Sequence, residues 1–196
     1  MHSFNLTCVG GKNEWNFLPS KKGDTYTDTV ARFALNNLKI NFKTHDFQNR
    51  GSDERQYSTP NVNMNMVSIM RSKYHDYDEY HTSLDDLNFM TPEFLQQSFN
   101  FYESLIEILE QDVRVFSKIK GEPNLNYLLR RVERGGQLHG SLKERLAFSE
   151  FMMYADGRTL VEICSKASLD FKTGLNVLKK LREEKLVEVL HLEINN

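Results

Sequence analysis

A loop crowded with ionisable and aromatic side chains is the part of this 196-residue sequence best suited to chemistry. Between residues 74 and 81 it carries two histidines, two aspartates and one glutamate among three tyrosines. A neutral imidazole is a good zinc ligand, and its second ring nitrogen is usually held by a carboxylate or a carbonyl group. The spacing therefore allows His81 to bind a metal ion while Asp85 or Asp86 orients its ring.

A second polar segment, from Gly51 to Tyr57, carries Asp53 and Glu54 on a loop between predicted strands. Sites in α/β sheets form beyond the carboxyl ends of strands, where both loops could meet. Each loop also has a purely structural explanation. A histidine in a polar loop is more often a surface or hydrogen-bonding residue, and the two acids could be solvated charges or helix caps. Residue types and spacing leave both explanations open.

Hydrophobic patterns indicate the elements that must position these loops. Apolar alternation predicts strands over residues 4–9, 40–47 and 64–70, and apolar residues at helical spacing predict a helix over 24–38. This order of strand, helix, strand, loop and strand predicts a partly parallel, mixed α/β sheet with flanking helices.

A longer helix is predicted to begin at Thr91-Pro92-Glu93. Threonine is a suitable N-cap, proline suits the first helical position, and an acid in the first turn is favourable. The pattern continues to about Gln111, and the helix is expected to pack on the sheet. The apolar residues expected to make that contact are Leu95, Phe99, Leu105, Ile106 and Leu109.

After this helix the sequence turns irregular, with Gly121-Glu122-Pro123 as one marker of a break. Such composition is typical of a domain boundary. We therefore predict an α/β domain over residues 1–113, a linker over 114–140 and a small domain over 141–196. In the small domain, three helical patterns of apolar residues precede an apolar strand, which is the layout of a winged helix-turn-helix.

Composition excludes several classes of protein. The net charge is -2, so the chain as a whole is not a basic nucleic-acid binder. It has no apolar run long enough to span a bilayer and no secretory signal pattern, which favours a cytoplasmic location. The two cysteines, Cys8 and Cys164, fall in different predicted domains and are interpreted as small buried residues.

Three motifs in order resemble the second half of the two-zinc aminopeptidase family. They are Asn5 to Gly10, Ser52 to Glu54, and Tyr80 to Asp85. The family shows an Asn-Leu-Asp-Met-x-Gly strand, a Ser-Asp-His loop and a late His-Thr-x-x-Asp motif. Together with Met70-Arg71-Ser72, the last two motifs more closely resemble a bacterial aminopeptidase-like family whose members carry a C-terminal winged helix. The resemblance covers nearly the whole chain.

The resemblance implies a zinc-dependent hydrolase that cleaves an amide bond next to a free amine, in a peptide or an amine-bearing small molecule. It implies that His81 is a zinc ligand and that Asp85 supports the His81 ring without binding the metal itself. It also places Asp53, Glu54 and Tyr80 near the substrate end of the cleft. Many relatives are linked to surface-polysaccharide biosynthesis.

The chain departs from the family pattern in three ways. Thr7 stands where the family strand has a metal-binding aspartate, and Glu54 stands where the loop has a histidine. In the family, the first histidine ligand, the bridging aspartate and the general-base glutamate precede the strand with which this chain begins. Because zinc sites use three or four protein ligands, we expect this chain alone to be an inactive C-terminal fragment that lacks an N-terminal segment.

An alternative function is that of a non-catalytic regulator whose winged helix binds DNA or a protein. The third C-terminal helix offers residue types that suit phosphates and bases. However, residues 141–196 contain nine Lys or Arg and nine Asp or Glu, so no basic face is evident and a protein-interaction or packing role is favoured. The candidate nucleic-acid contacts are Lys172, Thr173, Asn176 and Lys179.

Overall fold

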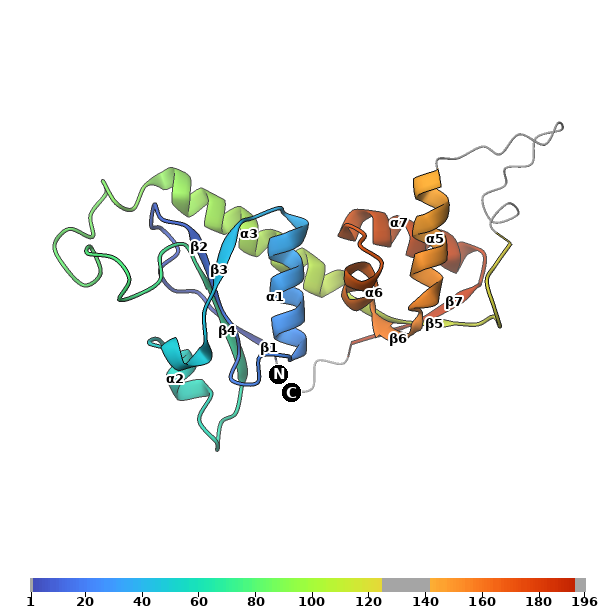
Figure 1. Ribbon diagram of the computed structural model, residues 1–196, viewed down its shortest axis with the longest axis horizontal. Coiled ribbons are helices and arrows are strands. Elements are labelled where there is room, and N and C mark those ends of the chain that lie inside the picture. Colours follow the sequence, from blue (N-terminus) through green and yellow to red (C-terminus); the bar gives the residue numbers. More distant parts are fainter. Residues whose placement is uncertain (1, 125–141, 193–196) are drawn as a thin grey trace. The chain divides into compact units, whose positions relative to one another are not determined.

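The computed structural model describes residues 2–124 and 142–192, which form two compact units divided between residues 110 and 111 (Figure 1). Each unit has its own sheet and is described by itself. Within these described ranges, no helix combines the length and the apolar character needed to cross a membrane.

A four-stranded sheet forms the centre of the first unit. Its strands are β1 (His2–Asn5), β2 (Trp15–Leu18), β3 (Phe42–Thr44) and β4 (Asn65–Met70). Their order is β1-β4-β2-β3; β1 is parallel to β4 and β2 is parallel to β3, while β2 and β4 are antiparallel. The predicted mixed, partly parallel α/β sheet is confirmed, although the short strand β2 was not predicted.

One face of this sheet is covered by the helices α1 (Tyr26–Asn37) and α3 (Pro92–Gln111). The guanidinium of Arg32 in α1 lies 4.5 Å from the ring centroid of Phe17. The ring of Phe101 in α3 lies 5.2 Å from that of Trp15. Trp15 and Phe17 are two residues apart on β2 and therefore point to the same face.

The short helix α2 (Glu54–Tyr57) covers the opposite face, and Figure 1 shows α1 and α2 on either side of the strands. The side chains of Leu18 and Met70 point to this second face and form a core cluster with Tyr74. Every residue of β4 after Asn65 is buried, which follows from cover on both faces.

The start of α1 is fixed by a capping box. The Thr25 side chain accepts a hydrogen bond from the Asp28 backbone N–H, and the Asp28 carboxylate accepts one from the Thr25 backbone N–H. The same carboxylate also accepts the Ser20 backbone N–H at 2.8 Å. These reciprocal bonds satisfy donors that the first turn leaves unpaired. The helix predicted over residues 24–38 is confirmed.

The helix predicted from Pro92 to Gln111 is also confirmed, but the prediction of its buried face was partly wrong. Leu105 is buried as expected. The exposed members of the predicted set are Leu95, Phe99 and Ile106. The helix instead turns Phe101 and Tyr102 toward the sheet, and the Tyr102 hydroxyl donates to the Ile69 carbonyl. Because apolar residues lie on more than one side of this helix, its pattern does not identify the buried side.

The second unit combines a three-stranded antiparallel sheet with three helices. The sheet order is β6-β5-β7. The strands are β5 (Val113–Ser117), β6 (Asp156–Thr159) and β7 (Val187–His191). The helices are α5 (Leu142–Met153), α6 (Leu160–Lys166) and α7 (Phe171–Glu183). The three helical patterns and the last strand are confirmed.

The structure differs from the predicted linker in its first residues. The strand β5 lies at the start of the segment assigned to 114–140, and it is the central strand of the second sheet. Two short strands with polar residues, β5 and β6, lack the apolar run that identified β7 in the sequence. Residues 125–141 of the predicted linker lie outside the described residues.

Close packing of α6 on α7 depends on a glycine. A Cβ atom on Gly174 of α7 would collide with the Cys164 sulfur of α6. Cys164 is fully buried, and burial raises the pKa of its thiol to about 12, which agrees with its interpretation as a small buried residue.

We therefore expect Gly174→Ala to lower the free energy of unfolding of the second unit by about 1–3 kcal/mol, the usual effect of overpacking. Urea denaturation followed by circular dichroism measures this change. Cys164→Ala in the same chain should restore part of the loss, because it removes the colliding sulfur. Asn176→Ala, at an exposed position of α7, is the control, and an equal loss in that variant would contradict the packing argument.

Candidate functional site

The carboxylate of Glu54 is fully buried and accepts hydrogen bonds on both oxygens. Its Oε1 accepts the backbone N–H groups of Gly51 at 2.8 Å and Ser52 at 2.9 Å. The same oxygen accepts the Tyr74 hydroxyl at 2.7 Å. Glu54 therefore closes the turn that precedes α2 and ties it to the start of the aromatic loop.

The second oxygen of Glu54 joins this turn to the sheet. Oε2 accepts the Asn5 side-chain amide at 2.7 Å and the Ser68 hydroxyl at 3.1 Å. Asn5 and Ser68 are directly paired residues of β1 and β4, and the Asn5 amide also lies 3.2 Å from the Ser68 hydroxyl. One carboxylate thus links two strands, the turn at α2 and the loop that follows β4.

These hydrogen bonds determine the ionisation of Glu54. Burial alone would raise the pKa of its carboxyl group, but the bonds from Tyr74, Ser52 and Gly51 outweigh burial and lower it from its usual 4.5. Burial and then the bond to Glu54 raise the pKa of the Tyr74 phenol. The pair is therefore a phenol donating to a carboxylate at neutral pH, which is a strong type of hydrogen bond.

Parallel pairing brings the ends of β1 and β4 to one edge of the sheet, where Arg71 N–H donates to the Cys8 carbonyl at 3.1 Å. The half-buried Cys8 sulfur accepts the Tyr77 hydroxyl at 3.5 Å and the Thr7 hydroxyl at 3.7 Å. Thr7, which stands where the resembled family has a metal-binding aspartate, is therefore turned toward its own neighbour.

The aromatic loop holds His81 at its surface. The rings of Tyr80 and His81 are stacked, with centroids 4.0 Å apart and an interplanar angle of 14°. The His75 ring meets the Tyr80 ring edge-on at 4.9 Å. His81 itself is exposed and has a φ of 56°, an unusual backbone conformation for a residue other than glycine.

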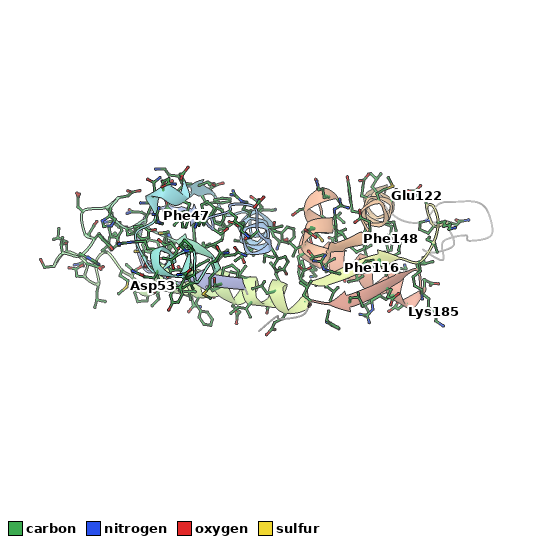
Figure 2. All side chains as sticks on the ribbon, turned by 90° about the horizontal axis from the view of Figure 1, so that it is seen from below. Phe47, Asp53, Phe116, Glu122, Phe148 and Lys185 are labelled. Atoms are coloured by element: carbon green, nitrogen blue, oxygen red, sulfur yellow. The ribbon has the colours of Figure 1, made fainter. Side chains whose placement is uncertain are left out.

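The predicted site residues have different environments. Tyr80 is half-buried, while Asp85 is exposed and makes no hydrogen bond to His81 within the described part of the chain. Asp53 is exposed beside α2 (Figure 2). Glu54 is fully buried, and both of its carboxylate oxygens accept hydrogen bonds. The substrate-binding roles of these residues stay predictions.

The described residues do not bring together a zinc ligand set. Across residues 2–124 and 142–192, no group of three or more His, Cys, Asp or Glu side chains is placed to hold a metal ion. An exposed histidine stacked on a tyrosine is one ligand, whereas protein zinc sites use three or four. The metal-binding role of His81 stays a prediction.

In the second unit, the candidate nucleic-acid contacts lie on α7. Lys172, Asn176 and Lys179 are exposed. Thr173 is engaged at the start of the helix, where its backbone N–H and its hydroxyl donate to the Asp170 carboxylate at 2.8 and 2.7 Å. Thr173 thus has a structural role, while the other three residues can contact a partner.

Sequence reasoning did not identify Tyr74 and Ser68 as partners of Glu54. Tyr74 stood among several similar aromatic residues, and Ser68 lay inside a predicted strand, where its hydroxyl carried no distinguishing signal. Asn5 was already part of a quoted motif. Its position on β1 opposite β4 is what gives it a role, and this depends on strand register.

Comparison with known proteins gives a family and two relatives. Residues 1–112 match the family model described as "Domain of unknown function (DUF4910)". A Clostridium acetobutylicum protein named "Putative polysaccharide biosynthesis protein with aminopeptidase-like domain" is 33% identical over 175 residues, which is 85% of this chain and 38% of that protein. The crystal structure of a "putative peptidase" from Clostridium acetobutylicum has a TM-score of 0.80 and 28% identity, covering 95% of this chain and 41% of that one. The chain spans about two fifths of each relative's length.

The first prediction from this site concerns stability. In Glu54→Gln, an amide NH₂ would face donors that now meet a carboxylate oxygen. We expect a loss of about 1–3 kcal/mol in the free energy of unfolding at pH 7, the usual effect of leaving a buried polar group unsatisfied. Urea denaturation measures it. The exposed Glu103→Gln is the matched control and should change little.

The second prediction concerns pH. Because the folded-state pKa of Glu54 lies below its usual 4.5, its ionisation stabilises the fold above that pH, and this contribution is lost as the pH falls through the folded value. The stability difference between wild type and Glu54→Gln should therefore shrink on acidification below about pH 4.5. A difference that stays constant from pH 7 to pH 3 would contradict the assigned hydrogen bonds.

Proposed function

The chain belongs to the DUF4910 family, and from that premise we propose that it is the C-terminal part of an aminopeptidase-like hydrolase. The observation that carries this proposal is the 33% identity to a protein with an aminopeptidase-like domain, over 85% of the chain. The similarity to the crystal structure of the "putative peptidase" also supports it, at the level of the fold. The proposed reaction is hydrolysis of an amide bond next to a free amine, and the proposed location is the cytoplasm.

Zinc dependence is part of the proposal for the longer protein. His81 is the candidate ligand and Asp85 the candidate supporting carboxylate. The donor set of the described residues does not fit a zinc site, because no other His, Cys, Asp or Glu residues join His81 in a group of three. The remaining ligands and the general base would have to come from a segment corresponding to the rest of the relatives.

What this chain supplies is a positioned loop. Glu54 and Tyr74 join the turn before α2 to the start of the loop that carries Tyr80 and His81. That loop follows β4, at the edge of the sheet where β1 also ends. Ligand-bearing loops in α/β proteins commonly lie at such an edge. This arrangement supports a role for residues 74–81 in an active site completed by other residues.

This proposal predicts that the chain alone, dialysed against zinc, retains less than one equivalent of metal and does not hydrolyse leucine p-nitroanilide. Elemental analysis and a colorimetric assay measure the two quantities. Stoichiometric zinc together with turnover would show that the chain holds a complete site and would refute the fragment interpretation.

A chimera in which residues 1–196 replace the matching part of the Clostridium relative tests the role of His81 directly. We expect the chimera to hydrolyse the substrate in a zinc-dependent way. His81→Ala should lower zinc affinity at least about 100-fold, because even substitution of a residue that only hydrogen-bonds to a metal ligand lowers the affinity about 10- to 100-fold. His75→Ala, an exposed histidine of the same loop, should bind zinc normally. Equal effects of both substitutions would contradict the assignment.

The second candidate function follows from the exposed α7. Three helices with a three-stranded antiparallel sheet resemble a winged helix-turn-helix, and exposed Lys172, Asn176 and Lys179 are suited to a partner. We propose a winged helix that contacts protein rather than DNA, because Glu183 and Glu184 stand beside the basic residues at the end of α7.

A gel-shift series with random-sequence duplex DNA between about 50 and about 200 mM salt tests whether this unit binds DNA or only protein, because phosphate contacts make DNA binding steeply salt-dependent. We expect no shift at physiological salt. A shift that weakens steeply with salt, and that disappears in the double variant Lys172→Ala and Lys179→Ala, would favour a DNA-binding regulator instead.

A further inference from the structure

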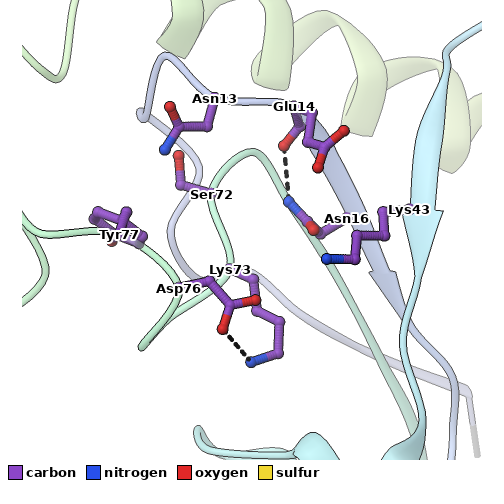
Figure 3. A pocket seen from close by; sticks show the side chains of 8 residues that line it. All are labelled: Asn13, Glu14, Asn16, Lys43, Ser72, Lys73, Asp76 and Tyr77. Carbon is purple, nitrogen blue, oxygen red and sulfur yellow. Dashed lines mark hydrogen bonds and ion pairs between the residues drawn. The ribbon is translucent and has the colours of Figure 1, made fainter.

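A polar hollow of about 450 Å³ opens at the edge of the first sheet where β4 ends and β2 begins (Figure 3). Its volume lies in the range of small-molecule sites. Every side chain that lines it can form hydrogen bonds. The lining residues are Asn13, Glu14, Asn16, Lys43, Ser72, Lys73, Asp76 and Tyr77.

The lining carries no net formal charge, because two lysines are balanced by one glutamate and one aspartate. It offers ammonium donors, carboxylate acceptors, and amide and hydroxyl groups that do both. Charges of both signs act on nearby His45. Burial lowers the pKa of its imidazole first, Lys73 and Lys43 lower it further, and Asp76 and Glu14 raise it. A ligand here would meet donors and acceptors rather than a field of one sign.

Part of the lining is held in place by the fold. Lys73 is buried, and its ammonium group donates to the Tyr74 carbonyl at 3.1 Å and lies 3.5 Å from the Asp76 carboxylate. The Asn16 amide donates to the Glu14 carbonyl at 2.8 Å. Figure 3 shows the Lys73–Asp76 ion pair and the Asn16–Glu14 hydrogen bond at different places in the lining. The polar groups are therefore positioned before any ligand arrives.

Ser72 is the feature that points to a ligand. Its side chain is 1% exposed, it lines the hollow, and its Oγ has no hydrogen-bond partner in the structure. Such an atom is uncommon, because leaving a buried hydroxyl without a hydrogen bond is unfavourable. Among the described residues, two other buried side-chain oxygens share this property, those of Ser3 and Ser58, and neither lines the hollow.

Tyr77 gives the hollow one aromatic wall. Its hydroxyl is directed to the Cys8 sulfur, and its ring is stacked on Phe89 with centroids 5.1 Å apart. The ring is therefore fixed and its polar end is already used. The Tyr80 ring also meets the Tyr77 ring, at 5.6 Å and 70°, so Tyr77 adds a fixed aromatic residue to an otherwise non-aromatic lining.

We propose that this hollow binds a neutral saccharide unit. A sugar ring presents hydroxyl groups that both donate and accept around its rim, together with C–H surface that packs on an aromatic ring. This matches a lining of mixed donors and acceptors with no net charge, an unpartnered buried hydroxyl and a fixed tyrosine. A phosphate or a carboxylate would meet Glu14 and Asp76 as well as the lysines, which disfavours an anion.

This inference goes beyond the proposed hydrolase, because it concerns binding by this chain itself and requires neither zinc nor turnover. The name of the Clostridium relative, a polysaccharide biosynthesis protein, is compatible with such a ligand. The two proposals can fail separately, since saccharide binding is measured on the metal-free chain and hydrolysis on the chimera.

The test is a titration of the ¹⁵N-labelled, metal-free chain with N-acetylglucosamine, followed by NMR chemical shifts. We expect saturable shifts at residues 13–16 and 72–77, with a dissociation constant on the order of 1 mM for a ligand of this size. Inorganic phosphate and L-glutamate at the same concentrations should not saturate. No saturable shift with the sugar, or tighter binding of either anion, would overturn the proposal.

Two variants connect binding to the hollow. Ser72→Ala should weaken N-acetylglucosamine binding about five- to tenfold through loss of one hydrogen bond, without lowering stability, because its hydroxyl has no partner in the protein. Lys43→Met, at an exposed position, should also weaken binding. Ser58→Ala makes the same chemical change at another buried, unpartnered serine and should bind normally. Unchanged binding in Ser72→Ala, or equal weakening in Ser58→Ala, would contradict the assignment.

Discussion

A buried carboxylate whose hydrogen-bond donors among the described residues are all neutral organises the first unit. Glu54 meets this requirement with five hydrogen-bond donors drawn from its own turn, from two strands and from the loop after β4. Removing one partner from such a network leaves a charge desolvated and underbonded. The network therefore fixes the register of β1 against β4 and the start of the aromatic loop together. The positions of Tyr80 and His81 depend on it, as does the Ser72–Lys73 side of the polar hollow.

Several parts of the fold were accessible from the sequence because they depend on local periodicity. The helix predicted over residues 24–38 follows from apolar spacing, and the helix after Thr91 follows from its capping residues and apolar spacing. The mixed sheet follows from the order of the elements. Strands β2 and β5 could not be predicted from the sequence, because a strand of four or five residues is defined mainly by its pairing with neighbouring strands. The prediction of the buried side of α3 was partly wrong for a related reason. Phe99 and Phe101 are equally apolar, and only tertiary packing decides which of them is buried.

In the candidate site, too, local motifs could be identified from the sequence but tertiary contacts could not. The motif that contains Glu54 was identified from the sequence, but the full burial of its carboxylate was not predicted. The contribution of this residue is to hold neighbouring loops, which strand register and long-range hydrogen bonds alone reveal. His81 lies on the loop that this network anchors, and its exposure is consistent with a ligand whose partners belong to the rest of a longer hydrolase. The family match and the Clostridium matches support a peptidase-like family for the chain, and the metal-binding role of His81 stays a prediction.

Amide hydrogen exchange at Gly51 and Ser52 tests the central claim most directly, because both N–H groups donate to Glu54 from a turn outside the sheet. The account predicts that these two amides are protected in the native chain and that they lose protection in Tyr74→Phe together with the amides of residues 72–76. Rapid exchange at Gly51 and Ser52 in the unmodified chain, or protection that persists without the Tyr74 hydroxyl, would show that the carboxylate does not join these loops.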